Sequence, residues 1–376
     1  MITRREMLAG TAAMGAALPA FAQDAGSGLN AAAKAKGMRF GSCFAWSPAG
    51  ADRGSFANPA YAALLERDCG ILVPENEFKW QATRPDAKTF NVERFADMLA
   101  YAESKGMPVR GHTLLWHKTE RFPQWLNDYD FGATPAKEAE RILTQHVKTM
   151  CKLYGARLYS FDVVNETIDE QTGLQRGSSL SRAYGGADAM CDHAFHVARE
   201  HAPGAQLVYN DYMSWEGGEK HRAGVLRLLE GFRKRGVPCD ALGLQSHIWV
   251  SGDHSVAQQV KDQEKGWRDF LDAVTGMGYT LEITELDIND KRLPTDIKAR
   301  DAKIADYMRA YLDVTLSYRQ LRDVLVWGMC DKYGWLNGFS PRADKSYQRA
   351  TPYDEHFQPK PIYTAIRQAF EAAPAR

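Results

Sequence analysis

Residues 278–288 read GYTLEITELDI, an apolar run that delivers a carboxylate at Glu285 and continues into further acidic residues. A buried parallel strand has this pattern when it carries an acid to the open end of a barrel. A second run, LYSFDVVNE at residues 158–166, ends in the same way at Glu166. Two glutamates at strand ends that face one cleft are the minimum requirement for hydrolysing a glycosidic bond.

Further candidate strands and amphipathic helices alternate along the chain. Eight strands, each followed by a helix, predict an α/β protein folded as a single (β/α)8 TIM barrel. An open doubly wound sheet is the competing architecture, but it would need a glycine-rich phosphate loop after an early strand, and the sequence has none. The predicted strands are Arg39–Phe44, Ile71–Glu75, Pro108–Leu115, Leu158–Asn165, Gln206–Asn210, Ala241–Ser246, Thr280–Glu285 and Val324–Trp327. The predicted helices include Asn91–Lys105, Thr134–Leu153, Ala187–Glu200, Glu219–Arg235, Val256–Thr275 and Asp296–Tyr318.

The first residues have the features of a targeting segment. A charged opening contains Arg4-Arg5, residues 9–20 are small and mildly apolar, and Ala20-Phe21-Ala22 supplies an A-x-A cleavage site. The arginine pair favours a twin-arginine signal, with an ordinary secretory signal as the alternative. We therefore expect a signal peptide at 1–22, a leader at 23–30, one catalytic barrel at 31–376, and export to the periplasm or out of the cell.

The charge balance argues against two classes of partner. Lys+Arg and Asp+Glu both number 47, so no global field draws the chain to nucleic acid or to anionic lipid. No segment after the signal is long and apolar enough to cross a membrane. We expect a monomer that binds neither nucleic acid nor membrane.

The six cysteines show no C-x-x-C pair and no short regular spacing. Export would permit disulfides, but a twin-arginine substrate crosses the membrane already folded from a reducing cytoplasm. We expect mostly free, buried thiols, and Cys151 with Cys191 is the pair to test.

The sequence predicts neither a metal ion nor another cofactor. The ten histidines lack the H-E-x-x-H spacing, and His193 and His196 lie on a predicted outer helix. A metal-dependent hydrolase and a non-catalytic carbohydrate-binding barrel are alternatives to a hydrolase that uses two carboxyl groups.

Polar and aromatic side chains stand where seven of the predicted strands end. Taken singly, a glutamate at such a place is usually a solvated loop residue, and a lone histidine or tryptophan is usually part of the core. Their conjunction favours a sugar site, because carboxylates, amides and one lysine suit the hydroxyl rims and indoles suit the apolar faces. The strand-end segments are ENEFKW at 75–80, RGHTLLWH at 110–117, NE at 165–166, NDY at 210–212, QSH at 245–247, ELD at 285–287 and WGMCDKYGW at 327–335.

These segments, in this order, resemble glycoside hydrolase family 10, the retaining endo-β-1,4-xylanases, over roughly residues 31–370. The GYTLEITELDI run is similar to the family's nucleophile segment, and FDVVNE at 161–166 is similar to its acid/base strand. The resemblance implies hydrolysis of internal xylosidic bonds by double displacement, with xylan and xylo-oligosaccharides as the bound partners. A related barrel hydrolase for another β-glucan, such as cellulose, is the second hypothesis.

The resemblance also implies a role for each matching residue. Glu285 would be the nucleophile, and Glu166 the general acid and later the base. Asn165 would hold the 2-hydroxyl of the attacked sugar, and His247 would hydrogen-bond the nucleophile with Asp287 behind it. The remaining matches would bind substrate, Trp80 among them. Tyr212 would stand at the first aglycone subsite, and the glycone side would be lined by Glu75, Asn76, Lys79, His112, Trp116, Gln245, Trp327 and Trp335.

The two carboxyl groups would need different pKa values, raised for Glu166 so that it keeps a proton, whereas Glu285 must be ionised. The sequence also departs from the family's pattern. Thr119 stands where a glutamine usually contacts the glycone side, and the loop at 167–186 lacks some common aromatic residues. The long polar stretch Gly338–Pro352 predicts an extra loop over the glycone end.

Overall fold

The computed structural model describes residues 28–376, and its central sheet is built from parallel strands. The strand order is β2-β1-β9-β8-β6-β5-β4-β3, and a parallel bridge between Leu72 and Val109 brings the two ends of the sheet together. The predicted (β/α)8 barrel is therefore confirmed. The strands are β1 (Arg39–Phe44), β2 (Ile71–Pro74), β3 (Arg110–Trp116), β4 (Ser160–Asn165), β5 (Gln206–Asp211), β6 (Ala241–Leu244), β7 (His247–Trp249), β8 (Thr280–Asn289) and β9 (Leu321–Val326).

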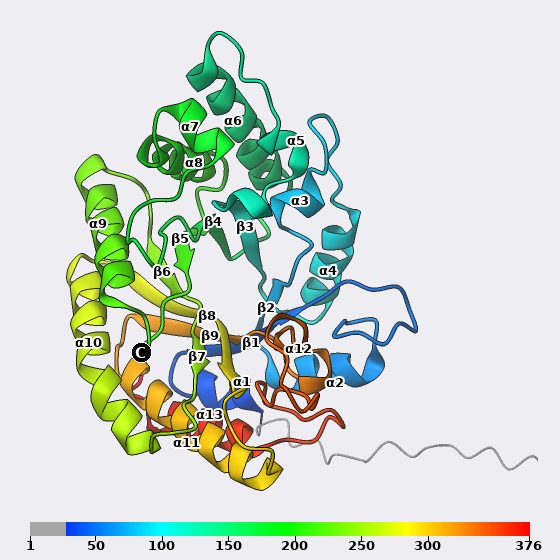
Figure 1. Cartoon of the computed structure of the whole chain (residues 1–376). Helices are drawn as coiled ribbons and strands as arrows, with labels where there is room; N and C mark the ends of the chain where they lie inside the picture. Colours follow the sequence, from blue (N-terminus) through cyan, green and yellow to red (C-terminus); the bar gives the residue numbers. More distant parts are fainter. Residues whose placement is uncertain (1–27) are drawn as a thin grey trace, which may run out of the picture.

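Each of the eight barrel strands is followed by a helix on the outside of the ring (Figure 1). The long helices carry one apolar face, as in α6, where Ile142, Val147 and Met150 are buried, and this face covers the sheet. The helices that follow the barrel strands are α2 (Pro59–Asp68), α4 (Glu93–Ser104), α6 (Pro135–Tyr154), α8 (Ala187–His201), α9 (Glu219–Arg235), α10 (Val256–Gly276), α11 (Ile297–Thr315) and α13 (Pro361–Ala372). Shorter helices are α1 (Leu29–Lys34), α3 (Trp80–Thr83), α5 (Gln124–Asn127), α7 (Ser179–Tyr184) and α12 (Leu336–Phe339).

Most strand boundaries differ from the prediction by one to four residues, and the two differences that shape the site lie at the carboxyl ends of β6 and β8. The predicted strand Ala241–Ser246 stops at Leu244, because Ser246 has a left-handed backbone with φ of 61°. The chain then resumes as β7, which pairs with the last residues of β8. Strand β8 consequently runs four residues beyond Glu285, to Asn289.

The folded region also begins earlier than the predicted start of the barrel at residue 31. Leu29 is fully buried, and its main-chain N–H donates to the Asp68 carboxylate at 3.1 Å. The last two residues of the predicted leader are therefore part of the fold. The predicted signal peptide at 1–22 lies outside the described residues.

Buried charges inside the barrel hold neighbouring strands in register beneath the site. The Arg110 guanidinium lies 2.5 Å from Asp162 Oδ1 and 3.0 Å from Glu282 Oε2, and all three side chains are nearly inaccessible to solvent. Charges at this depth persist only when they are paired. This cluster joins β3, β4 and β8, two of which carry the predicted catalytic glutamates.

All six cysteines are buried and free, as expected, so Cys151 and Cys191 form no disulfide. Within residues 28–376, no helix combines the length and the apolar character needed to span a membrane.

Candidate functional site

The two glutamates expected to catalyse lie together at the carboxyl ends of β4 and β8. Amide side chains connect them. Asn210 Nδ2 donates to Glu285 Oε1 at 2.8 Å and to Asn165 Oδ1 at 2.9 Å. Gln245 Nε2 in turn donates to Glu166 Oε1 at 2.9 Å. Both glutamate residues are only 6% exposed, so these amides fix the carboxyl groups with little competition from water.

The backbone of Glu166 contributes to this placement. It has a left-handed conformation with φ of 54°, which a residue with a long side chain adopts only at a cost of about 1–3 kcal/mol. Two hydrogen bonds hold it there, since its N–H donates to Asn210 O at 2.9 Å and its carbonyl accepts from Arg176 Nε at 3.2 Å. The turn directs the carboxyl group away from the strand and toward the Gln245 amide.

A row of three groups supports Glu285 from the other side. His247 Nε2 lies 3.2 Å from Glu285 Oε2, and His247 Nδ1 lies 2.9 Å from Asp287 Oδ1. Trp335 Nε1 donates to the second Asp287 oxygen at 2.5 Å. Burial alone would lower the pKa of His247, but Asp287 and Glu285 outweigh it and raise that pKa to about 10. The imidazole is therefore a cation at neutral pH and lies beside the carboxylate.

The electrostatic surroundings of Glu166 differ from the expectation. The Lys118 ammonium lies 2.7 Å from Glu166 Oε2. Burial acts to raise the pKa of Glu166, but the ion pair with Lys118 and the hydrogen bond from Gln245 outweigh it, so the pKa is lowered. This direction is opposite to the expected raised pKa, because no pattern in the sequence indicates that a cation reaches this carboxylate.

Most residues expected on the glycone side gather around Lys79. Lys79 Nζ donates a hydrogen bond to Asn76 Oδ1 at 2.9 Å. It also lies 4.8 Å from the ring centre of Trp116 and 5.9 Å from that of Trp327. Glu75, Glu166 and Glu285 all act to raise the Lys79 pKa, although burial dominates and lowers it. His112 also approaches Glu285, with Nδ1 3.9 Å from Glu285 Oε1.

Trp80 is a correction to the predicted substrate-binding set. Its side chain is only 1% exposed, and its ring stacks on His146 with the ring centres 3.9 Å apart. An indole packed in this way has no free face to offer a sugar. Trp80 opens helix α3, and the helical turn directs it into the core, a direction that the ENEFKW motif did not reveal.

Tyr212 is held by charged residues of the loop at 167–186. Its hydroxyl donates to the Glu170 carboxylate and accepts from Arg176 Nη2 at 2.5 Å. Arg176 also lies 2.9 Å from Asp169. The loop that lacks common aromatic residues therefore supplies charged side chains that orient the Tyr212 ring.

Two residues of the site were not among the predicted site residues. Asn210 is one of the predicted strand-end residues, and its position directly after three apolar or aromatic strand residues is a signal that could have identified it. Lys118 lies two residues beyond β3, and no pattern in the sequence distinguishes it from a solvated loop lysine. Thr119, the position of a missing glutamine, is exposed and donates to Gly177 O at 3.4 Å.

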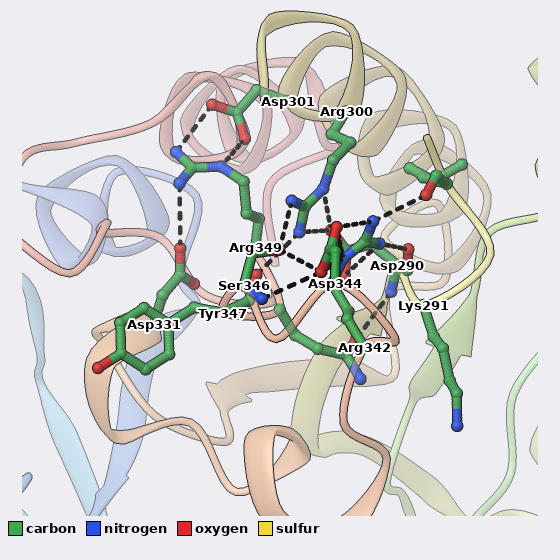
Figure 2. Close-up of polar contacts among 12 residues, drawn as sticks. Asp290, Lys291, Arg300, Asp301, Asp331, Arg342, Asp344, Ser346, Tyr347 and Arg349 are labelled. Atoms are coloured by element: carbon green, nitrogen blue, oxygen red, sulfur yellow. Dashed lines mark hydrogen bonds and ion pairs between the residues drawn. The ribbon is translucent and has the colours of Figure 1, made fainter. Parts of the chain in front are cut away.

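The stretch at 338–352 is fixed by arginines that reach two neighbouring strand ends. Figure 2 shows Arg300 and Arg342 turned toward Asp290, directly after β8, and Arg349 between Asp301 and Asp331. Arg300 Nη2 lies 2.5 Å from Asp290 Oδ2, and Arg342 Nη1 donates to the Asp290 carbonyl at 2.5 Å. The loop that follows Trp335 is therefore tied to the strand that carries Glu285.

We expect Arg300→Met to lower the free energy of unfolding by about 3–5 kcal/mol, because it leaves the buried Asp290 carboxylate short of its closest cation. Urea denaturation would measure the change. The matched control is Lys265→Met, which removes an exposed ion pair with Asp269 on α10 and should cost under about 1 kcal/mol. Equal losses in the two variants would contradict a structural role for the buried pair.

Within residues 28–376, no group of three or more His, Cys, Asp and Glu side chains is arranged to hold a metal ion. His193 lies on α8, on the outside of the barrel as predicted, and its Nε2 is 2.7 Å from Thr144 Oγ1.

The chain was compared with known protein families and curated proteins. The model of glycosyl hydrolase family 10 matches residues 28–369. Endo-1,4-beta-xylanase B of Thermotoga neapolitana is 31% identical over 311 residues, which cover 83% of this chain and 83% of the relative. Endo-1,4-beta-xylanase A of Caldicellulosiruptor saccharolyticus is 30% identical over 318 residues, covering 81% and 87%.

Solved structures give a consistent result. Native xylanase 10B from Thermotoga maritima superposes with a TM-score of 0.79 at 28% identity, covering 92% of this chain and 98% of that one. Xylanase 10B from Thermotoga petrophila, solved in complex with xylobiose, has a TM-score of 0.79 at 27% identity, covering 92% and 97%.

Proposed function

The chain belongs to glycosyl hydrolase family 10, and from this premise we propose that Glu285 is its nucleophile and Glu166 its general acid and base. The protein is a retaining glycoside hydrolase and acts on xylan as an endo-1,4-β-xylanase. The observation that carries the residue assignment is the chain of amides from Glu285 through Asn210 and Asn165 to Gln245 and Glu166. It places two carboxyl groups at one site with different partners.

In the first step, Glu285 attacks the anomeric carbon while Glu166 gives its proton to the leaving oxygen. The His247 cation and the Asn210 amide each donate a hydrogen bond to one oxygen of Glu285. These bonds hold the carboxylate in the orientation that a nucleophile needs. In the second step, Glu166 has lost its proton and activates a water that releases the sugar from Glu285. Two displacements at the same carbon give net retention.

The remaining predicted residues bind the substrate in this proposal. Asn165 holds the 2-hydroxyl of the attacked sugar, where a hydrogen bond that strengthens in the transition state accelerates the reaction. Asp287 accepts a hydrogen bond from His247 Nδ1 and so fixes the orientation of the ring. Tyr212 forms the first aglycone subsite, and the glycone side is lined by Glu75, Asn76, Lys79, His112, Trp116, Gln245, Trp327 and Trp335. Xylo-oligosaccharides are the bound partners, and the enzyme acts as a monomer without a cofactor.

We expect initial rates on xylan to exceed those on carboxymethyl-cellulose by at least about 100-fold. Xylose lacks the hydroxymethyl group of glucose, and the proposal is that Trp327 and Trp335 fill that space, so glucose would meet bulky side chains. Reducing-sugar release from the two polymers measures the ratio. Comparable rates would favour the second hypothesis, a hydrolase for another β-glucan. Trp335→Ala should lower the ratio by admitting the larger sugar.

We propose further that residues 1–22 form a twin-arginine signal and that one barrel domain follows the leader. The support is the Arg4-Arg5 pair and the A-x-A site ending at Ala22. Sequencing the amino terminus of the exported protein tests this, with Gln23 expected as the first residue. Export that continues after Arg4 and Arg5 are both replaced by lysine would instead indicate an ordinary secretory signal.

A further inference from the structure

Lys118 lies between the proposed acid/base and the proposed first aglycone subsite. Its ammonium is 2.7 Å from Glu166 Oε2 and 4.9 Å from the ring centre of Tyr212. Its side chain is 21% exposed, compared with 8% for Glu166. One flank of the ammonium therefore faces solvent, while the other covers the carboxylate that has to meet the glycosidic oxygen.

The leaving-group sugar needs both of the contacts that Lys118 makes. Its oxygen must hydrogen-bond to Glu166 to receive a proton, and its ring must approach the Tyr212 face to occupy the first aglycone subsite. The ammonium and the sugar cannot hold the same oxygen and the same ring face together. A long lysine side chain with a partly exposed head can swing aside into water at little cost.

We propose, building on the function proposed above, that Lys118 is a positioning residue that lies in the place the leaving-group sugar needs and is displaced from Glu166 when that sugar binds. It keeps Glu166 oriented between turnovers. Lys118 also couples the binding of the aglycone sugar to the protonation state of Glu166.

Other charged groups near Glu166 do not duplicate this contact. Within residues 28–376, Lys118 is the only cation in an ion pair with the Glu166 carboxylate. Lys79, after β2, acts on it at longer range, and Glu285 on β8 carries a like charge. Arg176 donates a hydrogen bond to the Glu166 main-chain carbonyl, and its guanidinium forms ion pairs with Asp169 and Glu170.

The consequence follows from the opposing effects on the Glu166 pKa. Burial raises this pKa and the Lys118 ammonium lowers it. When the sugar displaces the ammonium, burial loses its strongest opponent and only hydrogen bonds such as that from Gln245 still lower the pKa, so Glu166 takes a proton from solvent. That proton then moves to the glycosidic oxygen as the bond from this oxygen to the anomeric carbon breaks. Binding of the aglycone sugar thus protonates Glu166, and this is the proton that Glu166 later donates to the leaving oxygen.

The pH dependence of kcat/KM on two aryl β-xylobiosides tests the proposal. This quantity reports ionisations of the free enzyme, and its alkaline limb reports the loss of the proton from the acid. Phenol is a poor leaving group that needs the acid, whereas 2,4-dinitrophenolate leaves without it. With the phenyl substrate, we expect Lys118→Met to move the alkaline limb up by about 1–3 pH units. Lys118→Arg, which keeps the charge, should leave the limb within a few tenths of a unit.

With the dinitrophenyl substrate, wild type and both variants should show no such limb. Coinciding limbs of wild type and Lys118→Met on the phenyl substrate would overturn the proposal, and wild-type hydrolysis of xylan would still leave the proposed function intact. Equal losses on both substrates, without movement of the limb, would assign Lys118 a structural role and also overturn it.

A second measurement keeps Lys118 and so does not depend on how its variants fold. Calorimetry of xylotetraose binding to Glu285→Gln, in buffers of different ionisation enthalpy, counts the protons exchanged. Near pH 6 we expect uptake approaching one proton per sugar bound. Binding without proton uptake would overturn the proposal.

Discussion

Glu285→Ala is expected to lower turnover of xylan by several orders of magnitude, on the order of 10⁵-fold, because it removes the atom that forms the covalent intermediate. The cavity left beside His247 and Asn210 should admit azide, which would attack the anomeric carbon directly. One displacement replaces two, so the glycosyl azide would have inverted configuration. Initial rates with and without azide, and NMR of the product anomer, measure both effects.

The control for this experiment is Glu285→Gln, which keeps the shape of the side chain and its hydrogen bond with the Asn210 amide. It should be equally inactive, because an amide does not attack carbon, and it should resist azide because the space stays filled. Near wild-type rates in Glu285→Ala would remove Glu285 from the mechanism. An azide product of retained configuration would do the same.

Glu166→Ala should have an effect that depends on the leaving group. With phenyl β-xylobioside, kcat/KM should fall about 10²–10⁴-fold, the usual contribution of a general acid. With the 2,4-dinitrophenyl substrate, kcat/KM should stay within about tenfold of wild type, because that leaving group needs no proton. Its kcat should still fall, because no base activates the water that releases the sugar from Glu285.

Azide distinguishes this variant from Glu285→Ala. In Glu166→Ala it should accelerate the second displacement on an already inverted centre, so the glycosyl azide would have retained configuration. Asn165→Ala, next in the chain, is the matched comparison, since it should slow both substrates by weakening the 2-hydroxyl contact. A uniform loss on both leaving groups in Glu166→Ala would contradict the acid/base assignment.

The barrel could be predicted from the sequence because each strand and each helix has a recognisable pattern of apolar and polar residues within its own segment. The apolar run that leads to Glu285 indicates a buried strand by itself, and Gly236, with φ of 69° after α9, ends its helix where predicted. Thr134 shows the limit of such local reasoning. A threonine followed by a proline is typical of an N-cap and the first position of a helix. Pro135 does take the first position of α6, but the Thr134 side chain makes no capping hydrogen bond.

The site was predictable only where side chains leave strands in a fixed direction. Glu166 lies directly after β4 as predicted, whereas Glu285 lies within β8, which runs four residues beyond it. The lowered pKa of Glu166 depends on Lys118, which reaches it from the loop after β3. The buried position of Trp80 likewise depends on the turn into α3. The ion pairs between Asp290 and Arg300 join the end of β8 to α11, so they exist only once the barrel has folded.

The identity of the nucleophile is tested most directly by trapping the covalent intermediate. The reagent is a 2,4-dinitrophenyl β-xylobioside with fluorine in place of the attacked sugar's 2-hydroxyl. The fluorine slows both displacements, but the good leaving group accelerates the first. The covalent intermediate therefore forms faster than it is hydrolysed, and it accumulates. Digestion and peptide mass spectrometry should find the sugar on the peptide that contains Glu285. A label on Glu166, or stoichiometric release of dinitrophenolate without any labelled peptide, would contradict the account.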